Sequence, residues 1–151
     1  MKNLVLIGGG NQAHYTIDII ERENKYTIIG IIGNNVKLGV GIVAMAGCIF
    51  NPKAVLEDFT FFATGAQVEH DCYISNFASI SAGSILGGYV KVGNFSAITL
   101  GVTVIDRVGI GKNTVVGSGS VVVKDLPDNV LVYGNPAKII RDRKLREKFL
   151  K

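Results

Sequence analysis

Three adjacent residues near the middle of the chain, Glu69, His70 and Asp71, carry the side chains best suited to acid–base chemistry. An imidazole changes its charge near neutral pH, so a histidine is well suited to act as a general base there. A neighbouring carboxylate holds the ring in one tautomer and raises its basicity, provided that the backbone turns between the two residues. The alternative is a solvated turn whose charges face water. We therefore treat His70 as the candidate base and Asp71 as its candidate partner.

Two other reactive side chains are weaker candidates. Cys72 follows the charged triplet, but it stands at an inward position of the repeat described below, where apolar burial disfavours the reactive thiolate. For His14 we expect a structural role or a place beside a phosphate. The chain has 2 histidines, and no Cys/His cluster has the spacing of metal ligands, so we predict no metal site.

The glycine run Gly8-Gly9-Gly10 has the setting of a phosphate-binding turn. It follows the apolar run 3–7 and precedes a helix-like stretch, after which a second strand is expected over 26–32. The N–H groups at the start of such a helix favour anions. The spacing GGGNQA is not G-x-G-x-x-G, so a tight turn without a ligand is the alternative. Because about 35 residues are too few for a complete doubly wound sheet, we predict a truncated Rossmann-like βαβ unit.

These residues must be positioned by the elements around them, and the dominant pattern there is a period of six from Ala54 to Asp125. Large apolar side chains stand at Leu56, Phe62, Val68, Ile74, Ile80, Leu86, Val92, Ile98, Val104, Ile110, Val116 and Val122. A small or β-branched residue stands two positions before each of them. Neither a helix nor an ordinary strand has this period, but a solenoid with three short sides per coil does. We predict a mainly β protein whose parallel β-helix makes four coils of 18 residues.

The ends of the chain are expected to close this solenoid. We place a truncated nucleotide-binding-like α/β unit and linker at 1–47 and the β-helix domain at 48–151. After a strand at 130–133, the turn Gly134-Asn135-Pro136 is expected to precede a short C-terminal helix, with Ile140, Leu145 and Phe149 on one side.

Composition narrows the partners and the compartment. The net charge of +4 arises entirely in the tail 141–151, so the rest of the chain is balanced and no nucleic-acid-binding face is indicated. No apolar run reaches the roughly 18 residues of a membrane span, and we find no signal-peptide cleavage region. The 2 cysteines are expected to be reduced core thiols, which favours a cytoplasmic protein.

Several segments together resemble one known family. They are the hexapeptide repeat, VEHDC at 68–72, GKNTVVGSGSVVVKDLPDN at 111–129, VYGNPAKII at 132–140 and, less closely, residues 3–20. The family is that of the left-handed β-helix acyltransferases of the sialic acid O-acetyltransferase type. It is close to the bacterial enzymes that N-acetylate UDP-linked amino sugars. The resemblance implies the left hand of the helix and a homotrimer with acetyl-CoA between neighbouring β-helices.

Matched position by position, the resemblance also implies roles for individual residues. His70 corresponds to the family's catalytic base and Asp71 to its acidic neighbour, while a backbone N–H near Gly87 or Gly88 would bind the oxyanion. The implied coenzyme contacts are Ser79, Leu100 and Ser118, with Lys124, Lys138 and Arg141 as possible phosphate contacts or simply solvated cations. Relatives often carry a second histidine where this chain has Ser79. The implied sugar-nucleotide contacts are Gly8, Gly9, Gly10, Asn11, Gln12, Gly33 and Asn34, although Asn11 and Gln12 replace the family's usual Gly-His pair.

The function that this resemblance implies is transfer of an acetyl group from acetyl-CoA to the amino group of a UDP-linked amino sugar in bacterial glycan biosynthesis. One alternative is O-acetylation of sialic acid or a related sugar. Another is a trimeric β-helical scaffold or binding protein without turnover.

Overall fold

The computed structural model describes residues 2–7, 22, 26–144 and 147–148. The glycine turn at 8–10, Asn11, Gln12 and His14 lie outside the described residues, as does the helix predicted after them except for residue 22. These predictions are not tested.

The described residues form nineteen strands, most of which contain only two residues. They are β1 Lys2–Ile7, β2 Tyr26–Ile32, β3 Lys37–Leu38, β4 Val43–Ala44, β5 Cys48–Phe50, β6 Val55–Leu56, β7 Phe61–Phe62, β8 Gln67–Val68, β9 Tyr73–Ile74, β10 Ser79–Ile80, β11 Ile85–Leu86, β12 Lys91–Val92, β13 Ala97–Ile98, β14 Thr103–Val104, β15 Gly109–Ile110, β16 Val115–Val116, β17 Val121–Val122, β18 Val130–Tyr133 and β19 Lys138–Asp142.

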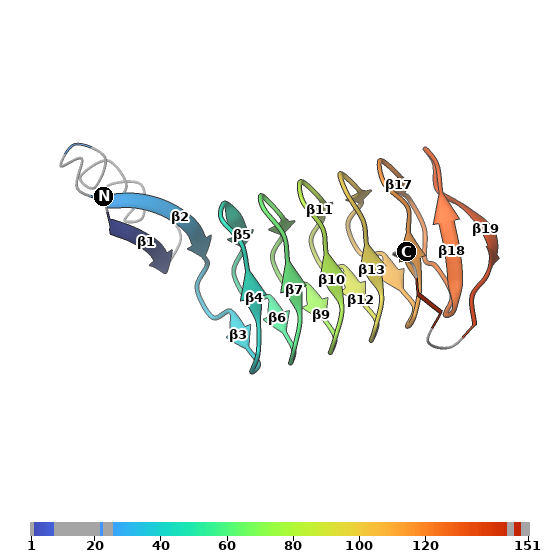
Figure 1. The fold of residues 1–151 in the computed structure, drawn as a ribbon, viewed down its shortest axis with the longest axis horizontal. Helices are drawn as coiled ribbons and strands as arrows, with labels where there is room; N and C mark the ends of the chain where they lie inside the picture. The colour runs from blue at the N-terminus through green and yellow to red at the C-terminus, as the bar shows by residue number, and fades with distance from the viewer. Residues whose placement is uncertain (1, 8–21, 23–25, 145–146, 149–151) are drawn as a thin grey trace.

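The strands form three sheets that are the three sides of a prism. Sheet A has the order β1-β2-β5-β8-β11-β14-β17, sheet B the order β3-β6-β9-β12-β15, and sheet C the order β4-β7-β10-β13-β16-β18-β19. Successive short strands visit sheets C, A and B in turn, and each pairs in parallel with the strand 18 residues away, as Ile80 does with Ile98. The coils stack along the long axis of the molecule (Figure 1). The predicted parallel β-helix is therefore confirmed.

The interior of the prism is filled by the residues that the six-residue spacing selects. None of the 24 predicted inward side chains from Ala54 to Val122 exposes more than 4% of its surface. Small hydroxyl residues at these positions bond to neighbouring coils: Ser84 Oγ donates to the carbonyl of Thr99 (2.7 Å) and Ser96 Oγ to that of Gly111 (2.6 Å). One bulky and one small side chain per strand thus fill a narrow core at close to crystal density.

The three edges of the prism share one backbone turn but differ in sequence. We call them the A–B edge (turns 34–35, 52–53, 70–71, 88–89 and 106–107), the B–C edge (40–41, 58–59, 76–77, 94–95 and 112–113) and the C–A edge (46–47, 64–65, 82–83, 100–101 and 118–119). The second residue of every one of these turns has a positive φ. On the C–A edge that residue is always glycine, which adopts this conformation without steric cost; on the other two edges it is mostly another residue.

The N-terminal end of the molecule extends sheet A. β1 pairs in parallel with β2, and β2 pairs in parallel with β5. The predicted boundary between the two domains lies at residue 48. Because β3 and β4 also pair with solenoid strands, the coils begin before that residue. How the chain divides into domains and whether 1–32 forms a Rossmann-like unit remain predictions.

The predicted C-terminal helix is wrong over residues 138–142. This segment is the strand β19, which pairs antiparallel with β18. The four residues 134–137 reverse the chain, so that β19 reaches the otherwise unpaired edge of sheet C. An exposed strand edge is a strong template for pairing, and the β-branched pair Ile139 and Ile140 suits a strand.

Candidate functional site

His70 is the first residue of the third turn on the A–B edge. Its neighbour Asp71 takes the left-handed conformation (φ 57°), which aspartate tolerates better than most residues. The Asp71 N–H donates to the carbonyl of Pro52 in the coil before (3.1 Å), and the N–H of Tyr89 in the coil after donates to the carbonyl of His70 (3.0 Å). The turn is therefore fixed from both sides.

Within this turn the two predicted catalytic side chains meet. His70 Nδ1 lies 3.0 Å from Asp71 Oδ2, and the side chains expose 52% and 26% of their surface. Because an ionised carboxylate accepts hydrogen bonds only, this contact fits the tautomer that has its proton on Nδ1 and its lone pair on Nε2. This arrangement gives a half-exposed imidazole with its basic nitrogen available to a substrate.

Gly88, in the coil after, forms the surface beneath the imidazole. A Cβ atom at Gly88 would lie 2.8 Å from both Cε1 and Nε2 of His70, so only glycine lets the ring lie there.

The backbone N–H groups predicted to bind an oxyanion are already bonded. Gly88 N–H donates to Asp106 Oδ1 (2.7 Å), and Gly87 N–H donates to the carbonyl of Val104 (2.9 Å). An oxyanion at Gly88 would have to displace the Asp106 carboxylate. The structure brings both glycines to the site, and their role in binding stays a prediction.

Cys72 also lies beside this turn, and its side chain is buried. Its Sγ donates to the carbonyl of Gly87 (3.0 Å). Burial raises the pKa of the thiol to about 11, so the group is protonated at neutral pH, as we expected.

Three further predicted residues lie along the same edge. The backbone carbonyl of Asn34 accepts a hydrogen bond from the Lys53 N–H (2.9 Å). Asn34 therefore lies two coils before His70, or roughly 10 Å away at the usual strand spacing. Lys124 lies three coils after His70 and is exposed. Gly33 is buried, and a Cβ there would lie 2.6 Å from the Pro52 nitrogen. Close packing of two coils therefore accounts for this glycine, and substrate contact by Gly33 and Asn34 remains a prediction.

The predicted coenzyme contacts gather elsewhere, in a groove on the outer surface of sheet C. Ser79, Leu100 and Ser118 line a cavity of about 680 Å³. Its other lining residues include Ser81, Thr99, Val115, Tyr133, Arg141, Arg143, Glu147 and Lys148. Of the two remaining predicted cations on this side, Arg141 lines the groove, whereas Lys138 lies on β19 and is exposed.

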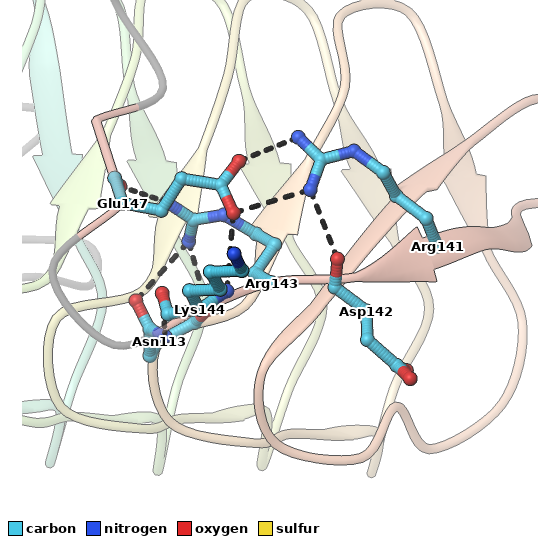
Figure 2. A network of polar contacts seen from close by, with 6 residues as sticks. All are labelled: Asn113, Arg141, Asp142, Arg143, Lys144 and Glu147. Atoms are coloured by element: carbon cyan, nitrogen blue, oxygen red, sulfur yellow. Dashed lines mark hydrogen bonds and ion pairs between the residues drawn. The ribbon is translucent and has the colours of Figure 1, made fainter.

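One wall of this groove is a polar network that sequence reasoning missed (Figure 2). The buried Arg143 donates from Nη1 to the carbonyl of Asn113 (2.8 Å), and Asn113 Nδ2 donates to Asn129 Oδ1 (2.9 Å). Arg141 forms a two-pronged ion pair with Glu147. The Arg141 guanidinium holds the pKa of Glu147 at about 2. The network joins Arg143 and Lys144 to Asn113 on the B–C edge, and Arg141 to Glu147.

The A–B edge and the sheet C groove lie on opposite sides of one chain. In a three-sided prism the edge between two sides faces away from the third side. The sheet strands that line the groove therefore lie on the side of the prism that faces away from His70 of the same copy.

Within residues 2–7, 22, 26–144 and 147–148, no three His, Cys, Asp or Glu side chains gather as metal ligands would. Nor does that part of the chain contain a helix long and apolar enough to cross a membrane.

The chain is similar to several acetyltransferases of known structure or curated sequence. A mutant GDP-perosamine N-acetyltransferase from Caulobacter crescentus, in complex with CoA and GDP-perosamine, is 34% identical; the match covers 94% of this chain and 70% of that one, with a TM-score of 0.71. The acetyltransferase domain of PglB from Neisseria gonorrhoeae FA1090, in complex with acetyl coenzyme A, is 27% identical over 85% of this chain and 66% of that one, with a TM-score of 0.64.

Among curated proteins, the galactoside O-acetyltransferase of Escherichia coli (strain K12) is 30% identical over 94% of this chain. The match covers 56% of that relative, and this chain spans less than two thirds of the length of the first curated relatives that it matches. No protein-family model matches the chain.

Proposed function

Because the chain belongs to the hexapeptide-repeat acetyltransferase family, we propose that it transfers the acetyl group of acetyl-CoA to an amino group of a nucleotide-linked amino sugar. The observation that carries this proposal is the His70–Asp71 pair on the A–B edge, with Nδ1 bonded and Nε2 available. The solved relative in complex with CoA and GDP-perosamine supports both substrates.

In the proposed reaction His70 acts as the general base. Its Nε2 takes a proton from the acceptor amine as the amine attacks the thioester carbonyl, and Asp71 stabilises the imidazolium that forms. The coenzyme A thiolate then leaves, so that no covalent intermediate on the protein is required. Cys72 takes no part, since its thiol is protonated and buried.

We further propose that the active site forms between copies of this chain in a homotrimer. The separation of His70 from the sheet C groove supports this arrangement, because an adjacent copy can bring its groove to the His70 edge. Ser79, Leu100 and Ser118 would then contact the coenzyme of the neighbour's site, with Arg141, Lys138 and Lys124 as candidate phosphate contacts.

The acceptor is proposed at the level of a nucleotide-linked amino sugar. The UDP form is what the sequence resemblance favours, and GDP-perosamine is what the solved relative binds. An O-acetyltransferase is a second candidate, since the relative from Escherichia coli acts on galactosides. We propose the cytoplasm as its compartment, because both cysteines are buried and unpaired.

Release of free thiol from acetyl-CoA tests the proposal. The parent protein and the His70→Ala variant are assayed with UDP-, GDP- and dTDP-linked 4-amino sugars, galactosides and sialic acid. We expect release with one or more nucleotide-linked amino sugars, and a rate lower by roughly 10²- to 10⁴-fold in the variant. Equal release by both proteins on every acceptor would refute the base assignment. Product mass spectrometry separates N- from O-acetylation.

Nucleotide binding by the N-terminal segment is tested separately. Titration calorimetry with UDP and GDP compares the parent with Gly9→Val, whose side chain should prevent close approach of a phosphate to the backbone. We expect heat from one nucleotide with the parent and none with the variant. The absence of heat with the parent would assign the glycine run to a structural turn.

A further inference from the structure

We propose that Tyr89 is a positioning residue that holds the His70 imidazole in its reactive orientation. The inference rests on the proposed function of His70 and extends it to a residue that sequence reasoning did not select.

Tyr89 occupies the A–B edge directly one coil after the His70 turn. Its ring meets the imidazole edge-on, with ring centroids 5.3 Å apart and an interplanar angle of 89°. Edge-to-face contact is a favoured geometry for aromatic pairs. The contact is tied to the backbone as well, because the Tyr89 N–H donates to the carbonyl of His70 (3.0 Å).

The tyrosine ring is itself held from the next coil. The guanidinium carbon of Arg107 lies 4.5 Å from the centroid of the Tyr89 ring, a cation–π distance. The Arg107 N–H donates to the carbonyl of Gly88 (2.8 Å). Three successive coils therefore place Arg107, Tyr89 and His70 in one row along the edge.

This row of side chains restrains a ring that has few other contacts. The His70 side chain is 52% exposed and has one hydrogen bond, to Asp71, so its ring would otherwise have room to rotate away from the Gly88 surface. Asp71 restrains Nδ1, Gly88 lies beneath Cε1 and Nε2, and Tyr89 restrains the ring from the neighbouring coil. A base that is held in place loses little entropy when the acceptor binds.

The other exposed aromatic side chains at this turn position behave differently. Phe59, Phe77 and Phe95 lie on the B–C edge and stack on one another, with centroids 5.3 and 4.9 Å apart. Phe95 has the same φ of 61° as Tyr89, and within the part of the chain that the structure describes its ring contacts that of Phe77 alone. Phe95 is therefore a matched control for loss of an exposed ring at a left-handed turn.

The kinetic test compares Tyr89→Gly, Tyr89→Phe and Phe95→Gly, in which glycine fits the left-handed backbone. For Tyr89→Gly we expect kcat to fall by about ten- to a hundredfold. KM for acetyl-CoA and acceptor should stay within about twofold of the parent values. Tyr89→Phe should restore kcat, and Phe95→Gly should leave it unchanged. A raised KM with an unchanged kcat would overturn the proposal, because Tyr89 would then contact a substrate.

A structural readout keeps this test independent of acetyl transfer. Because the chain has 2 histidines, the His70 ring signal in an NMR spectrum is assigned by comparison with His70→Gln. We expect a nuclear Overhauser contact between the His70 Cε1 proton and the Gly88 α-protons in the parent and in Tyr89→Phe, and its loss in Tyr89→Gly. Persistence of this contact in Tyr89→Gly would overturn the positioning role even if the protein acetylates no acceptor tested.

Discussion

The A–B and B–C edges are built from the same backbone turn, yet they serve different ends. On the B–C edge three of the left-handed positions hold Phe59, Phe77 and Phe95, whose rings stack on one another from coil to coil. On the A–B edge the equivalent positions hold Lys53, Asp71, Tyr89 and Arg107, and Asp71 and Tyr89 there contact His70. The comparison teaches that the repeat sets where a turn side chain points, while the residue type decides whether it stacks between coils or contacts the His70 imidazole.

The largest effect that this comparison of the two edges predicts comes from crowding the A–B edge at Gly88. In Gly88→Ala the new Cβ would lie 2.8 Å from two atoms of the His70 ring, so the imidazole must move. We expect acetyl transfer to fall by about ten- to a hundredfold, with little change in the thermal unfolding temperature.

Gly109→Ala is the matched control for this change. Its Cβ would meet the nearest atom, Asp125 Oδ1, at 3.6 Å, which is ordinary contact. Equal rates for the two variants would show that the glycine surface beneath His70 is not needed.

An intermediate effect is predicted for substitutions on the B–C edge, which should change the stability of the fold and leave the reaction rate unchanged. Phe77 stacks on two rings, and each aromatic pair contributes about 0.5–1.5 kcal/mol beyond burial. Phe77→Asn should therefore lower the free energy of unfolding by about 1–3 kcal/mol and leave kcat unchanged. Asparagine is chosen because it tolerates the left-handed backbone and occupies this turn position at Asn113.

Urea unfolding measures the difference, with Phe95→Asn as the comparison. Among the described residues Phe95 stacks on Phe77 alone, so the loss of the Phe95 ring should lower the free energy of unfolding by about half as much. If Phe77→Asn lowered kcat and left the free energy of unfolding unchanged, the separation of roles between the two edges would be wrong.

The smallest predicted effect is a pH dependence of thermal stability that arises from Glu147, which borders the sheet C groove. The Arg141 guanidinium lowers the pKa of Glu147 from 4.5 to about 2. A carboxylate with a lowered pKa in the folded state stabilises the fold fully above its unfolded pKa, and this contribution is lost as the pH falls toward the folded value. Glu147→Gln should therefore lower the unfolding temperature slightly at pH 7 and progressively less below pH 4.5.

Thermal unfolding of the parent and Glu147→Gln across this pH range measures the effect. A difference that grows as the pH falls would contradict the ion pair with Arg141.

Much of the solenoid was predictable because a period of six has one simple structural solution. The inward positions from Ala54 to Val122 followed from spacing alone, without any knowledge of strand pairing. The first coil, with β3 and β4, was harder to see because Ala44 stands where the later coils have a large apolar residue. The C-terminal strand was missed because the spacing of Ile140, Leu145 and Phe149 also suits a helix; pairing with β18 is a tertiary effect.

The candidate site was only partly predictable for the same reason. His70 and Asp71 are adjacent in the sequence, so their contact follows from one turn. Tyr89 stands 18 residues after Asp71, and this spacing was the signal that could have identified it. The Arg143–Asn113 contact joins residues 30 positions apart outside the regular repeat, and no spacing rule indicates it.

The central claim is that the His70 edge of one copy works with the sheet C groove of another, and mixing two inactive variants tests it most directly. His70→Ala removes the base, and Ser118→Trp fills the groove. Each variant alone should be nearly inactive while keeping the assembly state of the parent. Co-refolded in equal amounts, they should regain about a quarter of the parent activity, because one neighbouring pair in four combines an intact edge with an intact groove. Activity no greater than that of the separate variants would contradict the claim.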